Sequence, residues 1–287
     1  MSLHRQDPAP RLAWLEISVA LVLLGGCAAT PVEGPSPLLR AAAAQARVGE
    51  EAYLGGHASE AVPALNEAVR LHLAGGDLPG ASRALLNLAL AQRAAGDAAA
   101  AAATAARLTE LTPAALQQAH EARAPSGIGS EIATATNWLN ALLALDRGDF
   151  PTASAQLSAV SGSLPGSSAW SGRVANLRAE LALGEGRLME ALTLARAGQV
   201  ASAAARDRAE EARSWRIAGT AEVRLARWSE AQAEFLAAVR IEEALGGGNR
   251  MAGDLTQLAA IAGRLGDTRA AELYTRRAQA ITTARSP

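Results

Sequence analysis

Small residues recur along this chain at intervals close to forty residues, and this spacing limits the possible folds more than any other feature. Breaks marked by glycine or tryptophan fall at Gly55-Gly56, Gly96-Asp97, Gly148-Asp149, Gly186, Trp228 and Gly266-Asp267. An alanine that starts a helical apolar pattern follows each break, at Ala61, Ala101, Ala153, Ala191, Ala231 and Ala271. These alanines are 40, 52, 38, 40 and 40 residues apart. A fixed period of this kind is typical of stacked repeats, so we expect an all-α chain of about six helix-turn-helix units.

The composition favours closely packed helices over a β-sheet. Hydrophobic residues make up 49% of the chain and aromatic residues only 3%, and much of the apolar content is alanine, the strongest helix former. The sequence has no lysine, so all 27 basic residues are arginine, and the formal net charge is −1. This balance provides no broad positive field for a phosphate backbone, and we expect no nucleic-acid partner.

The unit from Ser214 to Val239 resembles the tetratricopeptide repeat (TPR). Trp215, Gly219, Ala231 and Phe235 match the W-x2-L-G and A-x3-F elements of that family, although Ala218 stands where leucine is usual. Looser matches extend the resemblance over roughly residues 38–284, with a period longer than the family's usual length of about 34 residues. The resemblance implies paired helices that stack into an α-solenoid. The alternative is a helical bundle whose alanine content only imitates a repeat.

The glycine-aspartate turns predict how helices end and begin, and the longest interval predicts an insertion. In Gly96-Asp97, Gly148-Asp149 and Gly266-Asp267, glycine suits the left-handed closing conformation, and aspartate can cap the next helix. The 52-residue interval contains Thr112-Pro113, which is typical of a helix cap followed by a first-turn proline. We expect an extra short helix and a flexible loop over about residues 112–130, and favour a tolerated insertion over a segment that binds a partner.

The only cysteine of the chain, Cys27, directly follows a short apolar run, residues 17–24. Arg5 and Arg11 precede this run, and Gly25 and Gly26 end it. An apolar core of this length that ends in small residues is typical of a secretory signal and is too short to span a membrane. The segment Leu24 to Cys27 resembles the lipobox of bacterial lipoproteins. The resemblance implies cleavage before Cys27 and acylation of its thiol and of the new amino group.

The lipoprotein resemblance also implies a location and a division of the chain. Ala28 follows the cysteine, which by the sorting rule of enterobacteria implies the outer membrane, facing the periplasm. Several acyl chains give stable membrane anchoring. We expect a signal peptide over 1–26, the lipidated cysteine and a proline-rich tether over 27–37, the repeat domain over 38–284 and a tail over 285–287. One alternative is a buried apolar helix that carries an inert thiol, and another is a cytoplasmic repeat adaptor whose apparent signal peptide is spurious.

No group of residues predicts catalysis or metal binding. His4, His57, His72 and His120 form no metal-binding pair at i, i+4, so we expect solvated surface histidines, no metal and no cofactor. A single cysteine excludes both an intramolecular disulfide and the usual multi-cysteine zinc site. A deep cavity holding His120, Glu121 and Ser126 would instead favour an envelope enzyme or a carrier of envelope precursors.

The repeat resemblance also implies a groove along the first helices of the units. The geometry of the family places in the inward row Arg47, Arg83, Asn87, Arg173, Asn176, Arg213 and Arg216. Arginine and asparagine could bind carboxylates or backbone amides of an extended peptide, or the arginines could solvate the groove or pair with Glu50 and Glu180. The family's two-carboxylate clamp needs lysine and is not reproduced. The sequence therefore predicts a non-catalytic lipid-anchored scaffold or assembly factor that binds envelope proteins.

Overall fold

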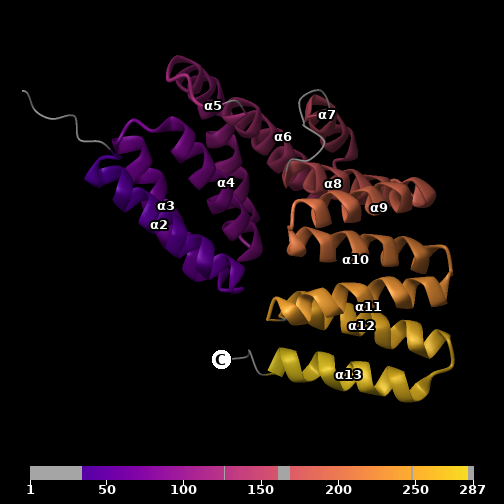
Figure 1. Ribbon diagram of the computed structural model, residues 1–287. Helices are drawn as coiled ribbons and strands as arrows, with labels where there is room; N and C mark the ends of the chain where they lie inside the picture. Colours follow the sequence, from indigo (N-terminus) through magenta and orange to yellow (C-terminus); the bar gives the residue numbers. More distant parts are fainter. Residues whose placement is uncertain (1–33, 126, 161–168, 247, 284–287) are drawn as a thin grey trace, which may run out of the picture.

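The computed structural model describes residues 34–125, 127–160, 169–246 and 248–283, which form α-helices and no strand (Figure 1). In chain order the helices are α2 (Pro37–Leu54), α3 (Ala58–Ala74), α4 (Leu78–Ala94), α5 (Ala98–Glu121), α6 (Ile128–Asp146), α7 (Phe150–Val160), α8 (Ala169–Gly184), α9 (Leu188–Ala204), α10 (Arg208–Arg224), α11 (Trp228–Ala244), α12 (Asn249–Arg264) and α13 (Thr268–Thr283). They make six consecutive pairs, from α2–α3 to α12–α13, as the sequence predicted.

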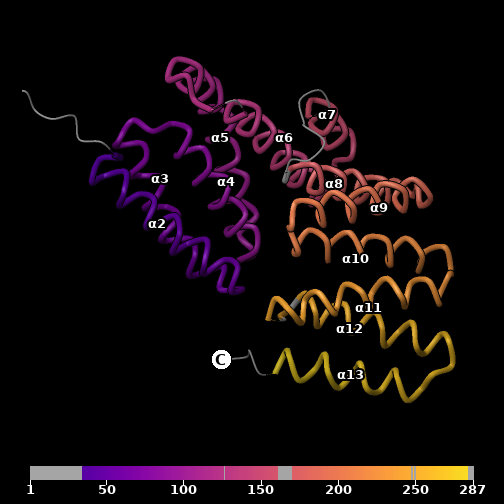
Figure 2. The backbone as a smooth tube through the Cα atoms, viewed as in Figure 1, coloured from indigo at the N-terminus to yellow at the C-terminus, as the bar shows by residue number. Residues whose placement is uncertain are grey.

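The pairs stack into an arch rather than around one centre (Figures 1 and 2). The first helices of neighbouring pairs contact one another, α2 with α4, α4 with α6, α6 with α8 and α8 with α10. The buried apolar residues accordingly form successive clusters, one over α3–α8, one over α8–α10 and one over α11–α13. A core that passes from pair to pair in this way is the arrangement expected of a solenoid.

The turns between helices follow the predicted chemistry. Gly96, Gly148 and Gly266 have φ values of 86°, 71° and 80°, in the left-handed region that closes a helix. Asp97 Oδ1 accepts a hydrogen bond from the backbone N–H of Ala100 at 2.9 Å, and Asp149 and Asp267 cap α7 and α13 in the same way. Each cap satisfies an N–H that has no partner within its own helix.

Small side chains lie where paired helices cross most closely. A Cβ atom on Gly49 would lie 2.5 Å from Leu65 Cγ, and one on Gly219 would lie 2.8 Å from the Phe235 ring. Five of the six repeating alanines, from Ala61 to Ala231, are fully buried. The backbones can therefore approach because these positions carry little or no side chain.

The extra residues of the longest interval do not form the predicted separate helix. Thr112 and Pro113 lie inside α5, which runs unbroken for 24 residues, whereas α3, α9 and α11 have 17. The Thr112 hydroxyl donates to the carbonyl of Leu108 at 2.8 Å, instead of capping a new helix, and lies 2.8 Å from Thr136 Oγ1 of α6. These contacts hold the segment in the helix, and α5 is therefore about two turns longer than α3, α9 and α11.

The proposed signal peptide, Cys27 and most of the tether lie outside the described residues. The first described helix begins at Pro37, and the side chain of Ser36 caps it by accepting from the N–H of Leu39 at 3.2 Å. None of the helices within the described ranges combines the length and apolar character needed to cross a membrane.

Candidate functional site: the inner face of the arch

We call the side of the arch lined by the first helices of the pairs, α4 to α12, its inner face. Many polar side chains of these helices join one pair to the next. Asn87 of α4 donates to Glu50 of α2 at 2.6 Å, and Arg93 of α4 donates to Asp146 of α6 at 2.7 Å. Arg213 of α10 makes two hydrogen bonds to Glu180 of α8, at 2.7 and 2.8 Å. We call these contacts the inter-repeat ladder.

The ladder continues between α10 and α12. Arg216 donates to both carboxylate oxygens of Asp254, at 2.6 and 2.8 Å, and to Glu242 at 3.0 Å. Asp254 and Glu242 are almost fully buried. Burial raises the pKa of Asp254 above its usual value, although the hydrogen bond and charge of Arg216 oppose that shift. The cost of burying this carboxylate is thus only partly offset by its partner.

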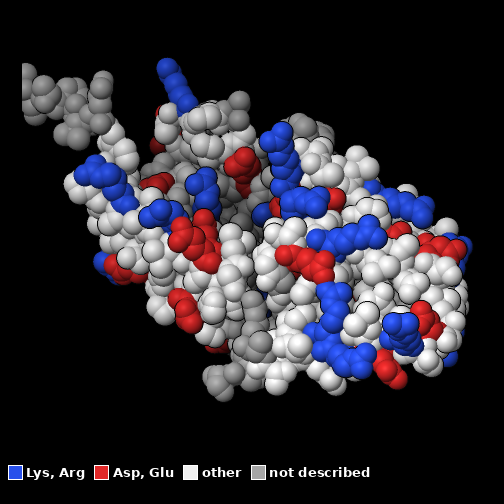
Figure 3. All heavy atoms as spheres, turned by 60° about the horizontal axis from the view of Figure 1, so that its bottom comes forward, with Lys and Arg blue, Asp and Glu red and all other residues white. Residues whose placement is uncertain are grey.

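Two of the five predicted groove arginines, Arg213 and Arg216, are therefore structural, because their charge is used within the protein. Burial by itself would lower the pKa of Arg213, but Glu180 and Glu210 raise it above the usual value. Arg213 and Arg216 pair with neighbouring repeats in the way that the alternative interpretation allowed, including the predicted pair with Glu180. On the face shown in Figure 3, acidic and basic side chains are accordingly interspersed.

Asn176 does not face the groove, and that part of the prediction is wrong. Its side chain is fully buried between α8 and α10. Its amide donates to the carbonyl and carboxylate oxygens of Glu210, each at 2.9 Å, and Ser214 Oγ donates to its Oδ1 at 2.6 Å. Both polar groups of the Asn176 side chain are thus used inside the protein and are not available to a ligand.

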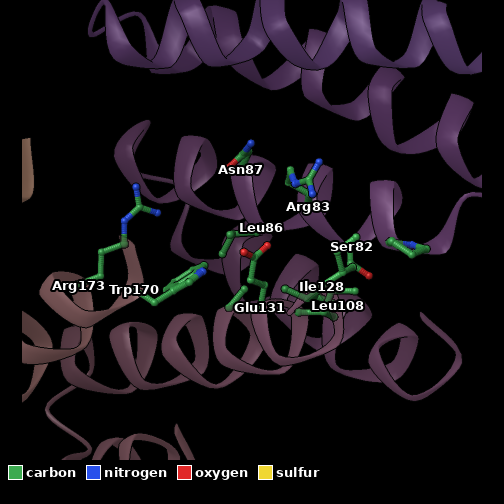
Figure 4. A pocket seen from close by; sticks show the side chains of 12 residues that line it. Ser82, Arg83, Leu86, Asn87, Leu108, Ile128, Glu131, Trp170 and Arg173 are labelled. Carbon is green, nitrogen blue, oxygen red and sulfur yellow. The ribbon is translucent and has the colours of Figure 1, made fainter. Parts of the chain in front are cut away.

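A recess of about 230 Å³ lies between α4, α6 and α8 on this face (Figure 4). Its apolar part includes Leu86 of α4, Leu108 of α5, and Ile128 and Ile132 of α6. Its polar part consists of Ser82, Arg83, Asn87, Glu131 and Arg173. Three of the predicted groove residues, Arg83, Asn87 and Arg173, thus come together around one recess.

Arg173 is held in place at the end of the recess formed by α8. Its guanidinium lies 5.3 Å from the ring centroid of Trp170 and 3.2 Å from Asp207 Oδ2. Its carbonyl accepts a hydrogen bond from Trp138 Nε1 at 3.2 Å, and the Trp138 and Trp170 rings meet edge to face. Because of these contacts, Trp170 and Arg173 form a rigid wall.

Arg83 and Glu131 differ from these residues because they are exposed and unpaired. Arg83 lies on α4 and Glu131 on α6, on facing helices (Figure 4). Within the described ranges, both side chains are exposed and neither makes a hydrogen bond or an ion pair, and so both charges are free to meet a ligand.

Arg83 also borders a second recess, of about 260 Å³, between α2 and α4. Arg47 lines this recess and lies 3.9 Å from Glu51 while remaining exposed. His72 lines it too and is not the solvated histidine that we expected, since Asp77 Oδ2 lies 2.8 Å from its Nδ1 and its side chain is only 12% exposed. Asp77 also caps α4 through the N–H of Gly80, so it links the recess to the start of that helix.

Sequence reasoning missed Glu131 and Trp170. Glu131 is the residue after the 112–130 interval, and only the departure from the repeat period pointed to this region. A deep cavity holding His120, Glu121 and Ser126 would have favoured an enzyme or a carrier. His120 and Glu121 are instead exposed at the end of α5, and Ser126 lies outside the described residues. The described part of the chain also contains no cluster of three or more side chains able to hold a metal ion.

Several solved structures overlay with most of this chain. BtubC (BKLC) from P. vanneervenii overlays with a TM-score of 0.55 at 19% identity, covering 87% of this chain and 92% of that chain. A kinesin light chain protein with TPR-like repeats from Podosopora anserina gives a TM-score of 0.36 at 16% identity, covering 88% of this chain and 100% of that chain. The TPR2AB domain of yeast Sti1, in a pHSP90 complex, gives 0.30 at 16% identity, covering 85% and 94%.

No protein-family model matches the sequence, and no curated protein sequence matches it. At 19% identity, the similarity to BtubC concerns the fold alone. The described residues form six stacked helix pairs with a period near forty residues, and the chain is a TPR-like α-solenoid.

Proposed function

We propose that this protein is a non-catalytic scaffold that binds another protein through an extended segment laid along the inner face of its arch. The observation that carries this proposal is the recess between α4, α6 and α8, where Arg83 and Glu131 remain unpaired while most neighbouring charges join the repeats. A rigid face with unpaired polar groups and apolar depressions suits an extended ligand, because little order has to be imposed when the ligand binds.

We further propose that acyl chains on Cys27 hold the scaffold at the outer membrane, facing the periplasm, where it assists envelope proteins. The support is the apolar run and the Leu24–Cys27 segment that precede the repeats. Confinement to a membrane surface raises the effective concentration of the scaffold near clients in the same compartment.

The protein-binding part is tested by photo-crosslinking in intact cells. A photo-reactive amino acid at Arg83, inside the recess, should give discrete crosslinks to a protein. The matched position is Arg107, an exposed residue of α5 that does not line the recess, and it should not give the same products. Crosslinks from position 107 with none from 83 would contradict the inner-face assignment.

The anchoring part is tested separately, by mass spectrometry of the mature N-terminus. The expected species begins at an acylated Cys27, and Cys27→Ala should move the protein from the membrane fraction to the soluble fraction. A mature chain that still carries Met1 would contradict the anchor and leave the scaffold proposal to be judged on the crosslinks alone.

A further inference from the structure

The size and lining of the recess between α4, α6 and α8 restrict what can enter it. Its volume of about 230 Å³ is below the range of roughly 300–1,000 Å³ of most small-molecule pockets. Leu86, Leu108 and Ile132 form a fixed apolar floor, since each is at most 8% exposed. A site of this size and polarity suits a single bulky apolar side chain rather than a whole cofactor.

The unpaired charges of Arg83 and Glu131 determine which charged residues of a ligand can lie on either side of that apolar side chain. Arg83, on the α4 side, can bind a carboxylate with two parallel hydrogen bonds, and Glu131, on the α6 side, can pair with an arginine or a lysine. A ligand with only negative charges, such as a nucleic acid or a purely acidic peptide, would bring like charge against Glu131. The pair therefore favours a ligand with both signs of charge.

The other polar groups around the recess, including the charged Arg173 and the neutral amide of Asn87, cannot replace these two charges. Arg173 is committed to Asp207 and to the Trp170 ring, and Asn87 is committed to Glu50. Moving either of them toward a ligand would break a contact that joins two repeats. Selectivity for charge thus depends on Arg83 and Glu131.

We infer that the recess binds an extended segment of a partner protein in which one bulky apolar side chain lies between an acidic residue and a basic residue. The acidic residue lies against Arg83 and the basic residue against Glu131, with the apolar side chain on the floor beside Trp170. This inference rests on the proposed scaffold function and adds the chemistry of the segment that is recognised.

The test is selection from a random peptide library displayed on phage, with the purified full-length protein as bait. Wild type should enrich peptides with acidic, apolar and basic residues in one order. Arg83→Glu should enrich peptides with a basic residue in place of the acidic one, Glu131→Arg should make the opposite replacement, and the double variant should invert both charges. A peptide selected on wild type should bind each single variant roughly fivefold to tenfold more weakly.

Matched controls are Arg107→Glu and Glu110→Arg, because both residues are exposed on α5 and line neither recess. These variants should select the wild-type pattern. Circular dichroism checks that each variant is folded. A change in tryptophan fluorescence on peptide binding that is lost in Trp170→Phe reports binding at the recess itself.

Three results would overturn the inference. The same peptides could be selected by all variants, which would place binding elsewhere on the scaffold. The selected peptides could lack the pair of opposite charges. Selection could also fail while position 83 still crosslinks to a protein, in which case the scaffold function stands and the extended segment is wrong. Failure of both the selection and the crosslinking would reject the proposed function as well.

Discussion

At the scale of single residues, the described turns between helices contain at least one residue in the left-handed backbone conformation. Glycine supplies it at most of them, as at Gly186 with a φ of 79°. The turn between α10 and α11 has no glycine, and Ala226 takes the same conformation with a φ of 58°. A side chain makes this conformation unfavourable by roughly 1–2 kcal/mol, because Cβ crowds the following carbonyl oxygen. The turn before Trp228, which the sequence marked without a glycine, therefore has the same backbone conformation as the glycine turns, but Ala226 is strained in it.

Replacing that alanine should stabilise the protein. We expect Ala226→Gly to raise the free energy of unfolding by up to about 1 kcal/mol, because the strain is relieved although the unfolded chain gains freedom. The matched variant is Gly186→Ala at the equivalent turn, where a Cβ would meet nothing within 4 Å. It should lower the free energy of unfolding by a similar amount through backbone strain alone. Urea denaturation measures both, and equal effects of the same sign would contradict the argument.

At the scale of helices, the distance between the two members of a pair is set by the smallest residue at their crossing. In α10 and α11 this residue is Gly219, which lies against the Phe235 ring. Phe235 is only 1% exposed and cannot swing into solvent without leaving a cavity. The W-x2-L-G element of the sequence therefore corresponds to a packing contact rather than to a turn.

A larger residue at this crossing should separate the two helices. We expect Gly219→Val to lower the free energy of unfolding by about 1–3 kcal/mol, the usual effect of overpacking a core. Gly253→Ala in α12 is the control, since a Cβ there meets nothing within 4 Å, and it should stabilise by up to about 1 kcal/mol through helix propensity. Thermal denaturation followed by circular dichroism separates the two, and a neutral Gly219→Val would show that the pair is loosely packed.

At the scale of the whole molecule, α13 packs against α12 at one edge of the described arch. Ala271 of α13 is partly exposed, unlike the five fully buried alanines of the earlier repeats, and Leu273 is 49% exposed. Arg269, Glu272 and Arg276 give the outer side of α13 the polar character that a terminal repeat needs for solubility. With a neighbour on one side only, this helix lacks one of the interfaces that stabilise inner helices.

Protection against hydrogen exchange should therefore be uneven along the chain. We expect backbone amides of α13 to exchange roughly tenfold faster than those of α10 and α11, because local opening of the last helix breaks a single interface. Hydrogen–deuterium exchange with mass spectrometry measures this difference. Protection of α13 equal to that of α10 would mean that the array unfolds as one cooperative unit, or that another surface covers its end.

The sequence by itself determined the helices, the turns and the stacking, because these depend on contacts within a few residues and on a period of small side chains. Gly96 and Asp97, for example, close one helix and cap the next by local hydrogen bonds. The tertiary structure alone decided which inward charges are free, since Arg83 and Arg213 look alike in sequence and differ only in whether a carboxylate from a distant helix comes within reach. It also decided that α5 passes through Pro113, because the Thr112 hydroxyl found partners in Leu108 and Thr136. Pairing across 24 to 53 residues depends on helix crossing and register, which local propensity does not encode.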